Sequence, residues 1–342
     1  MGLESVKSLV VEVLRGDIVE SVHRVHVVVS HAERGVVASA GDPAHVSFVR
    51  SAIKMFQALP LVEGGGVSRF GLTSEELALC TASHGGERFH VAAARSILAK
   101  VAVTEESLAC GPQVPMHGPS ADALRAAGIA PGRIHNNCSG KHGGMLAFTS
   151  QQGWTMDGYH AHDHPTQQRI FATMATWAGV DTRSVSHAID GCGLPTYALP
   201  LEAVSRACAR FAAAAADGQP APAALVDAMT RHPEYVAGTD RLCTDLMCTA
   251  KGRLFAKVGA EGFYCAGVPS MRLGVAIKVE DGAWRAVEPA LLATLRHLDA
   301  ISTSEFESLA HYATPRILNT RHEVVGAIRA RLAASAPLLR PW

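Results

Sequence analysis

The sequence predicts a mixed α/β (α+β) fold, in which strands from both ends of the chain form an antiparallel sheet with packed helices and an inserted helical lobe. Three observations predict it. β-Branched runs lie near the N-terminus, Ala-rich segments with helical spacing fill the middle, and β-branched runs return after Lys251. We expect sheet strands in residues 1–50, a mainly helical lobe in 51–251 and the completing strands and helices in 252–342.

The elements can be assigned in order along the chain. Near the N-terminus, "RVHVVVSHAERGVVASAGD" holds two β-branched runs separated by a polar, Gly-containing segment, which predicts a hairpin. From Ser51 the pattern becomes helical, with "SAIKMFQALPLV" followed by further Ala-rich helices. The Pro-rich stretch 216–227 predicts a loop. Strands return in "GRLFAKVGAEGFYCAGV" and "LGVAIKVEDGAWRAVEP", and we expect further helices around 289–299 and 323–333.

Composition excludes several classes of partner. Lys plus Arg and Asp plus Glu both number 31, so no charge excess favours nucleic acid or a membrane surface. Apolar runs are shorter than the roughly 18–20 residues of a membrane span, and the N-terminus lacks the pattern of a secretory signal. The eight cysteines are widely spaced, as in a protein of a reducing compartment. We expect a cytoplasmic enzyme with a small substrate.

Ser51 and Lys54 form a Ser-x-x-Lys pair where the predicted helix begins after a strand. One helical turn separates them, so both side chains lie on one face. A serine hydroxyl becomes a good nucleophile when a nearby base takes its proton, and a lysine with a lowered pKa can be that base. Taken alone, the pair is a weak motif and favours a helix cap and a surface lysine; its place where a helix follows a strand favours the catalytic interpretation.

Two further motifs follow in an informative order. Ser83 opens "SHGGE" after an apolar helix, and Lys257 precedes Gly259 on a late strand. A Ser-x-x-Lys, a serine in a helical lobe and a late Lys-x-Gly is the order found in penicillin-binding enzymes and class A β-lactamases. In this chain Ser83-His84-Gly85 replaces the Ser-Asp-Asn of those enzymes, which argues against β-lactam chemistry.

The Gly-rich stretch "RIHNNCSGKHGGML" does not fit a phosphate-binding loop, because the glycine and hydroxyl positions of that motif are both wrong. A metal site is an alternative, since Cys138 lies near Lys141 and a second cysteine, Cys192, follows Asp190 downstream. Thiolates are good zinc ligands. Without a Cys-x-x-Cys pair, two buried structural cysteines remain an equal alternative.

Together the motifs resemble the rhizobial-type L-asparaginases. The resemblance is carried by five segments in order, which are "RSAIK", "CTASHGGERFH", "NNCSGKHGGML", "DGCGLPTYALPL" and "AKVGAEGFYCAG". It extends over nearly the whole chain and implies a fold similar to serine β-lactamases and penicillin-binding proteins, unrelated to the threonine-dependent asparaginases. One departure is His322, three positions after Asn319, where that family usually has glycine.

The resemblance implies roles for four catalytic residues. Ser51 is similar to the nucleophile and Lys54 to its base, while Ser83 and Lys257 are similar to a second Ser/Lys pair that relays protons. The reaction implied is hydrolysis of L-asparagine to L-aspartate and ammonia through an acyl-enzyme. We expect the backbone N–H groups of Ser51 and of a residue near Ala260 to stabilise the oxyanion.

The resemblance also implies a zinc ion with a supporting role. Its ligands would be Cys138, Lys141 and Cys192, with water as the fourth. Substrate-binding candidates are Asp190, Arg50 and His142. A homodimer is what the resemblance suggests. The alternatives are a penicillin-recognising enzyme or other amidase of the same fold, a zinc hydrolase in which metal-bound water attacks, and a non-catalytic amino-acid-binding protein.

Overall fold

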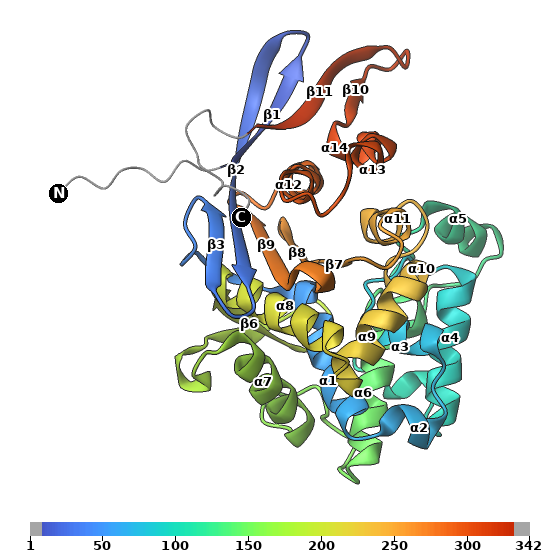
Figure 1. Ribbon diagram of the computed structural model, residues 1–342. Coiled ribbons are helices and arrows are strands. Elements are labelled where there is room, and N and C mark those ends of the chain that lie inside the picture. Colours follow the sequence, from blue (N-terminus) through green and yellow to red (C-terminus); the bar gives the residue numbers. More distant parts are fainter. Residues whose placement is uncertain (1–8, 332–342) are drawn as a thin grey trace. The chain divides into compact units, whose positions relative to one another are not determined.

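The computed structural model describes residues 9–331 and divides into two compact units. The sheet unit combines the chain up to Ala52 with Leu199–Ala213 and the part from Thr249 onward. The helical unit comprises Ile53–Ala198 and Ala214–Cys248. Figure 1 labels the elements of both units.

Strands from both ends of the chain form one antiparallel sheet in the sheet unit (Figure 1). The strands of this sheet are β1 (Leu9–Arg15), β2 (Ile18–His31), β3 (Gly35–Ala40), β7 (Phe255–Val258), β8 (Phe263–Val268), β9 (Leu273–Val279), β10 (Arg316–Leu318) and β11 (Val324–Arg331). Their order is β10-β11-β1-β2-β9-β8-β7, and β3 also pairs with β2. Val10 lies opposite Arg331, and Val25 lies opposite Val279. The predicted antiparallel sheet from N- and C-terminal strands is therefore confirmed.

Helices pack directly on this sheet. The helices of the unit are α8 (Leu201–Ala216, of which the residues to Ala213 belong here), α12 (Trp284–His297), α13 (Thr303–Ser308) and α14 (Ala310–Ala313). Helix α12 contacts β1, β2, β8, β9 and β11. At Gly274 of β9, an added Cβ would lie 2.2 Å from the Ser205 carbonyl oxygen, so helix α8 rests directly on the strand backbone.

Two buried helices form the centre of the helical unit. The elements of this unit are α1 (Lys54–Glu63), α2 (Gly66–Phe70), α3 (Ser74–Cys80), α4 (Arg88–Lys100), α5 (Gly118–Ala126), α6 (Ser139–Gln151), α7 (Pro165–Ala178), β5 (His187–Ile189), β6 (Pro195–Pro200, its first four residues), α9 (Pro220–Arg231), α10 (Pro233–Val236) and α11 (Leu242–Thr249, to Cys248). Helix α1 contacts α6, α7 and α9, and α6 also contacts α3 and α4. Residues 54–61 and 139–149 are all buried. Polar side chains on helices buried on every side require a specific reason.

Two sequence expectations are wrong. The segment 323–333 was expected to be helical, but Val324–Arg331 is strand β11, which pairs with β1; residues 332–333 lie outside the described part. The stretch 216–227 was expected to be a loop, but helix α9 begins at Pro220. Proline is tolerated in a first helical turn, where no intrahelical N–H bond is lost, and the alanines that follow favour the helix.

Within residues 9–331, no helix combines the length and apolarity needed to span a bilayer. All eight cysteines carry free thiols, and only Cys248 among them is exposed.

Candidate active site

Ser51 lies in a short 3-10 turn, Arg50–Ile53, which follows strand β4 (Val46–Phe48). The turn begins with Arg50 in the left-handed backbone region, at a φ of 48°. Within the sheet unit, the carbonyl oxygen of Ala52 accepts a hydrogen bond from the Cys265 thiol at 2.9 Å. The turn that carries Ser51 is thus held against strand β8.

Lys257 lies on β7, the neighbour of β8 in the same unit, opposite Cys265. Its side chain is fully buried, and its Nζ donates a hydrogen bond to the Val258 carbonyl oxygen at 2.9 Å. Gly259 follows, and an added Cβ there would lie 3.1 Å from the Val49 carbonyl oxygen and 3.4 Å from the Ala52 Cβ. The end of the Lys-x-Gly strand therefore packs directly on the Ser51 turn.

Lys54, three residues after Ser51, is the first residue of α1 and is fully buried. Its Nζ donates hydrogen bonds to the Ser83 Oγ at 2.9 Å, to the Cys138 Sγ at 3.2 Å and to the Ala82 carbonyl oxygen. Burial lowers the pKa of Lys54, because an ammonium loses its hydration in the interior. A lowered pKa increases the fraction of neutral amine, which is the form that can accept a proton.

The turn after helix α3 fixes the position of Ser83 through its backbone. The Ser83 N–H donates to the Val236 carbonyl oxygen at 2.9 Å, and the His84 N–H donates to the Asn137 carbonyl oxygen at 3.1 Å. The His84 Nδ1 accepts from the Gly86 N–H at 3.1 Å. Backbone hydrogen bonds to two other segments of the helical unit therefore fix the position of Ser83.

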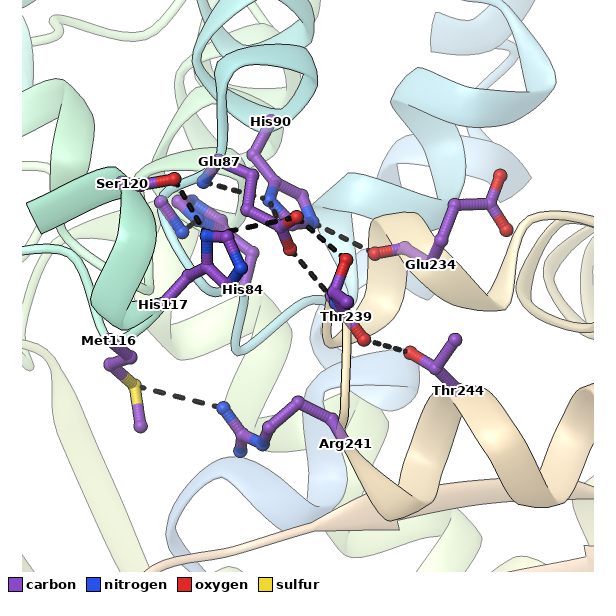
Figure 2. A network of polar contacts seen from close by, with 12 residues as sticks. His84, Glu87, His90, Met116, His117, Ser120, Glu234, Thr239, Arg241 and Thr244 are labelled. Carbon is purple, nitrogen blue, oxygen red and sulfur yellow. Dashed lines mark hydrogen bonds and ion pairs between the residues drawn. The ribbon is translucent and has the colours of Figure 1, made fainter. Parts of the chain in front are cut away.

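Figure 2 shows a network of side chains around Glu87, at the end of this turn. The Glu87 carboxylate accepts hydrogen bonds from the Thr239 N–H at 2.9 Å and from the Thr239 Oγ1 at 2.8 Å. His90 accepts the Glu87 N–H at Nδ1 and donates from Nε2 to the Glu234 carbonyl oxygen, so its ring is neutral. Burial lowers the pKa of His90 to about 4, in agreement. The Val236 carbonyl oxygen, which accepts the Ser83 N–H, and Thr239 belong to one segment. Glu87 therefore links this segment to the turn that carries Ser83.

Gly238, next to Thr239, packs so closely on Glu87 and His90 that no side chain fits at this position. Its φ is +113°, and an added Cβ would lie 2.5 Å from the Glu87 Oε1 and 3.1 Å from the His90 Cε1. We expect Gly238→Ala to lower the free energy of unfolding by about 2–4 kcal/mol, from backbone strain and from displacement of the carboxylate. Chemical denaturation measures the change.

Gly153→Ala is the matched control, because Gly153 also has a positive φ (+70°) but nothing within 4 Å of an added Cβ. Gly153→Ala should lower the free energy of unfolding only by the backbone strain, about 1 kcal/mol. Equal losses for the two variants would show that the contact with Glu87 does not restrain Gly238.

Two thiols and a second lysine form a cluster beside Lys54. The Lys141 Nζ donates to the Cys192 Sγ at 3.2 Å, and the Cys138 thiol hydrogen-bonds to Cys192. This bond and Lys141 lower the pKa of Cys192 to about 5, whereas the same bond and burial raise the pKa of Cys138 to about 12. Burial by itself lowers the pKa of Lys141, but the two sulfurs and Asp190 outweigh burial and raise it. The cluster therefore holds one thiolate next to an ammonium.

The second half of the Gly-rich stretch, from Ser139, is the start of helix α6. Cys138 precedes the helix, and Lys141 lies in its first turn. An added Cβ at Gly140 would lie 2.5 Å from the Leu79 carbonyl oxygen, and one at Gly144 would lie 2.8 Å from the Cys80 Sγ. The glycines let α6 approach helix α3 closely enough to bring Cys138 to Lys54.

Asp190 and Cys192 share a tight turn that follows strand β5. The Asp190 N–H donates to the Leu194 carbonyl oxygen at 2.8 Å, and the Asp190 carboxylate accepts from the Gly191 N–H at 2.7 Å. Gly193 has a φ of +85°, a backbone conformation that glycine adopts without strain. The turn presents the Cys192 sulfur and the Asp190 carboxylate to the same lysine, Lys141.

His142 is fully buried on α6, and its Nδ1 lies 2.6 Å from the Tyr159 Oη. Burial, together with Lys141, lowers the pKa of His142 to about 3, so the ring is neutral. Among residues 9–331, no three His, Cys, Asp or Glu side chains form a group that could hold a metal ion. A metal at the Cys138–Cys192 pair therefore requires Lys141 as its third protein donor.

The structure brings some expected site residues together and adds others. Within the helical unit, Lys54 contacts Ser83 and Cys138, and Lys141 contacts Cys192. The sheet unit holds Arg50, Ser51 and Lys257. The sequence interpretation missed Glu87 and Tyr159. Glu87 was visible as the last residue of "SHGGE", whereas nothing distinguished Tyr159 among the histidines of "GYHAHDHPT".

Comparison with known proteins gives one family. A family model described as L-asparaginase II matches residues 11–330 of the chain. No curated protein shows a significant match.

Proposed function

The chain belongs to the L-asparaginase II family, and we propose that it hydrolyses L-asparagine to L-aspartate and ammonia through an acyl-enzyme formed on Ser51. The family makes it an asparaginase-type amidohydrolase. The observation that carries the proposed mechanism is the buried Lys54 amine, three residues after Ser51 and 2.9 Å from the Ser83 Oγ. An uncharged amine in the interior is suited to take a proton from a hydroxyl.

In the first half-reaction, the Ser51 Oγ attacks the carboxamide carbon of asparagine and Lys54 takes the hydroxyl proton. The tetrahedral oxyanion is stabilised by backbone N–H groups, for which Ser51 and Ala260 are the candidates. Lys54 returns the proton to the leaving nitrogen, the C–N bond breaks, and ammonia departs. Water then attacks the aspartyl ester, Lys54 accepts its proton, and the proton passes to the Ser51 Oγ as aspartate leaves.

Ser83 and Lys257 serve this reaction as a second Ser/Lys pair. The hydrogen bonds of the Lys54 Nζ to the Ser83 Oγ, the Cys138 Sγ and the Ala82 carbonyl oxygen hold its amine in one orientation. Lys257 is likewise buried and held by the Val258 carbonyl. We assign the pair to proton relay and to retention of the substrate.

The substrate is an amino acid, so the site must bind an ammonium and a carboxylate as well as the carboxamide. The Asp190 carboxylate suits the substrate ammonium, and the Arg50 guanidinium, next to the nucleophile, suits the substrate carboxylate. His142 is the third substrate-binding candidate. Its neutral, buried ring suits an uncharged or anionic oxygen.

The donors of the thiol–lysine cluster fit a zinc ion. Zinc prefers thiolate sulfur and nitrogen donors. Cys138, Lys141 and Cys192 offer two sulfurs and one nitrogen, and the Cys192 sulfur hydrogen-bonds to both of the others. A zinc ion bound there would polarise or orient the substrate and tie helix α6 to the Asp190 turn. Because a Ser/Lys pair already supplies a nucleophile, we assign the metal a supporting role.

We expect zinc affinity to fall as the pH falls. Binding requires a neutral Lys141 and an ionised Cys138, and the pKa values of both are raised in the protein without metal. Two protons are therefore released, and affinity should weaken by about 100-fold for each pH unit lost. Competition titration with a zinc chelator at several pH values measures the zinc affinity. An affinity independent of pH would contradict Cys138, Lys141 and Cys192 as the ligands.

Cys138→Ala should abolish stoichiometric zinc, because it removes one of two sulfur donors. Cys80→Ala is the control, because Cys80 is also buried. The pKa of Cys80 is raised chiefly by burial, whereas the pKa of Cys138 is raised first by its hydrogen bond to Cys192. Unchanged zinc content in Cys138→Ala would refute the ligand assignment.

Three features rest on the same proposal. A serine β-lactamase-like fold is supported by the antiparallel sheet and by the order of Ser51-x-x-Lys54, Ser83 and Lys257-x-Gly259. A homodimer follows from the family resemblance. A reducing, cytoplasmic compartment agrees with eight free thiols.

A panel of substrates tests the function. Ammonia release from L-asparagine should exceed that from L-glutamine, and a chromogenic cephalosporin should not be opened. Turnover of the cephalosporin alone would favour a penicillin-recognising enzyme of the same fold. No turnover of any substrate would favour an amino-acid-binding protein.

A further inference from the structure

Three groups of the helical unit form a buried chain of hydrogen bonds that the proposed mechanism does not use. The Ala109 N–H donates to the Tyr159 Oη at 3.0 Å, and the Tyr159 Oη lies 2.6 Å from the His142 Nδ1. Tyr159 is 2% exposed and His142 is 0% exposed. In the described part of the chain, the His142 Nε2 is buried without a hydrogen-bond partner.

Counting hydrogens along this chain fixes the tautomer of His142. The Tyr159 Oη accepts the Ala109 N–H, and its own hydrogen has His142 Nδ1 as its acceptor. Nδ1 therefore accepts, and the neutral ring carries its proton on Nε2. The opposite assignment would leave both the tyrosine hydroxyl hydrogen and the Nε2 lone pair unsatisfied in the interior, which costs more than one unsatisfied group.

The unpartnered Nε2–H belongs to a ring in a functional neighbourhood. His142 interacts electrostatically with Lys141, Cys138 and Lys54, the groups assigned to metal binding and proton transfer. A buried donor without a partner is rare in proteins and calls for an acceptor, such as an oxygen of a bound ligand or an ordered water. A protonated nitrogen cannot coordinate a metal, so the ligand that Nε2 awaits is a hydrogen-bond acceptor.

We propose that Tyr159 is a positioning residue that holds His142 in the Nε2–H tautomer, so that His142 donates a hydrogen bond to an oxygen of the bound substrate and does not ligate zinc. This inference rests on the proposed function, because it takes the substrate to be an amino acid with carboxamide and carboxylate oxygens. It assigns Tyr159 a positioning role and excludes His142 as a zinc ligand.

Tyr159→Phe tests the inference in the full-length enzyme. Without the hydroxyl, Nδ1 loses its donor and the Nε2–H tautomer is no longer favoured. We expect kcat/KM for L-asparagine to fall by about 3- to 10-fold, the equivalent of one hydrogen bond, mainly through a higher KM.

Tyr197→Phe is the matched control. Tyr197 is also fully buried in the helical unit, but its hydroxyl has no hydrogen-bond partner in the described part of the chain. Removing that hydroxyl should leave kcat and KM unchanged. Equal kinetics for Tyr159→Phe and Tyr197→Phe would overturn the proposal.

A spectroscopic readout separates this role from a merely structural one. Nitrogen NMR of histidine-labelled protein, with His142→Gln to assign the signal, should show a protonated Nε2 and an unprotonated Nδ1, and Tyr159→Phe should shift this balance. His142→Gln should retain its zinc. An unprotonated Nε2 in the wild type, or loss of zinc in His142→Gln, would overturn the proposal. Full activity in Ser51→Ala would overturn the proposed function instead, and the assignment of the His142 tautomer would still hold.

Discussion

Replacing Ser51 by alanine is expected to lower kcat for L-asparagine by on the order of 10³-fold or more. The hydroxyl is the group that forms the acyl-enzyme, and only binding and backbone hydrogen-bond donors remain without it. Ser51 is half-buried in the turn Arg50–Ile53, so the substitution should not disturb folding. A coupled assay of ammonia release measures the loss.

Ser68→Ala is the control for this prediction, because Ser68 is exposed on helix α2. It should show wild-type kinetics. Full activity in Ser51→Ala would instead favour a hydrolase in which zinc-activated water attacks the amide.

Lys54→Met should lower kcat by about 10²–10⁴-fold, the usual contribution of a general base. Methionine keeps most of the length of the side chain, so the buried site stays filled. Because burial lowers the pKa of Lys54, the neutral base gains population as the pH rises through that pKa. In the wild type kcat/KM should therefore rise with pH over this range, and the rise should be absent in Lys54→Met.

Two further measurements make this result interpretable. Lys54→Met should keep the fold, because methionine fills the buried volume, while the loss of the hydrogen bonds to the Ser83 Oγ and the Ala82 carbonyl oxygen lowers the free energy of unfolding by about 1–3 kcal/mol. Lys100→Met provides the control, because Lys100 is partly exposed and pairs with Glu76 at 2.6 Å, away from the reacting groups. The same pH profile in wild type and Lys54→Met would assign the base to another residue.

Much of the fold could be predicted from the sequence because local pattern and tertiary structure agree. The hairpin of β2 and β3 and the late strand β9 follow runs rich in β-branched residues, and β7 and β8 follow aromatic and apolar runs separated by glycine. Strand β11 was missed because its Ala and Arg residues favour a helix locally, whereas pairing with β10 and with β1 makes the segment a strand. Tertiary pairing of this kind overrides local preference.

The site could be predicted in part. Ser51 and Lys54 are one turn apart, so their spacing is visible in the sequence, and Lys257 follows a strand pattern. The approach of Cys138 to Lys54 depends on glycines that allow two helices to touch, and the sequence pattern does not show which helices meet there. Tyr159 contacts His142 on another segment, and no periodicity encodes that contact.

Mass spectrometry of enzyme quenched in acid during turnover of L-asparagine shows directly whether Ser51 is the nucleophile. We expect an aspartyl ester on the peptide that contains Ser51, and no adduct in Ser51→Ala. An adduct on Ser83, or turnover in Ser51→Ala without any adduct, would contradict this role of Ser51.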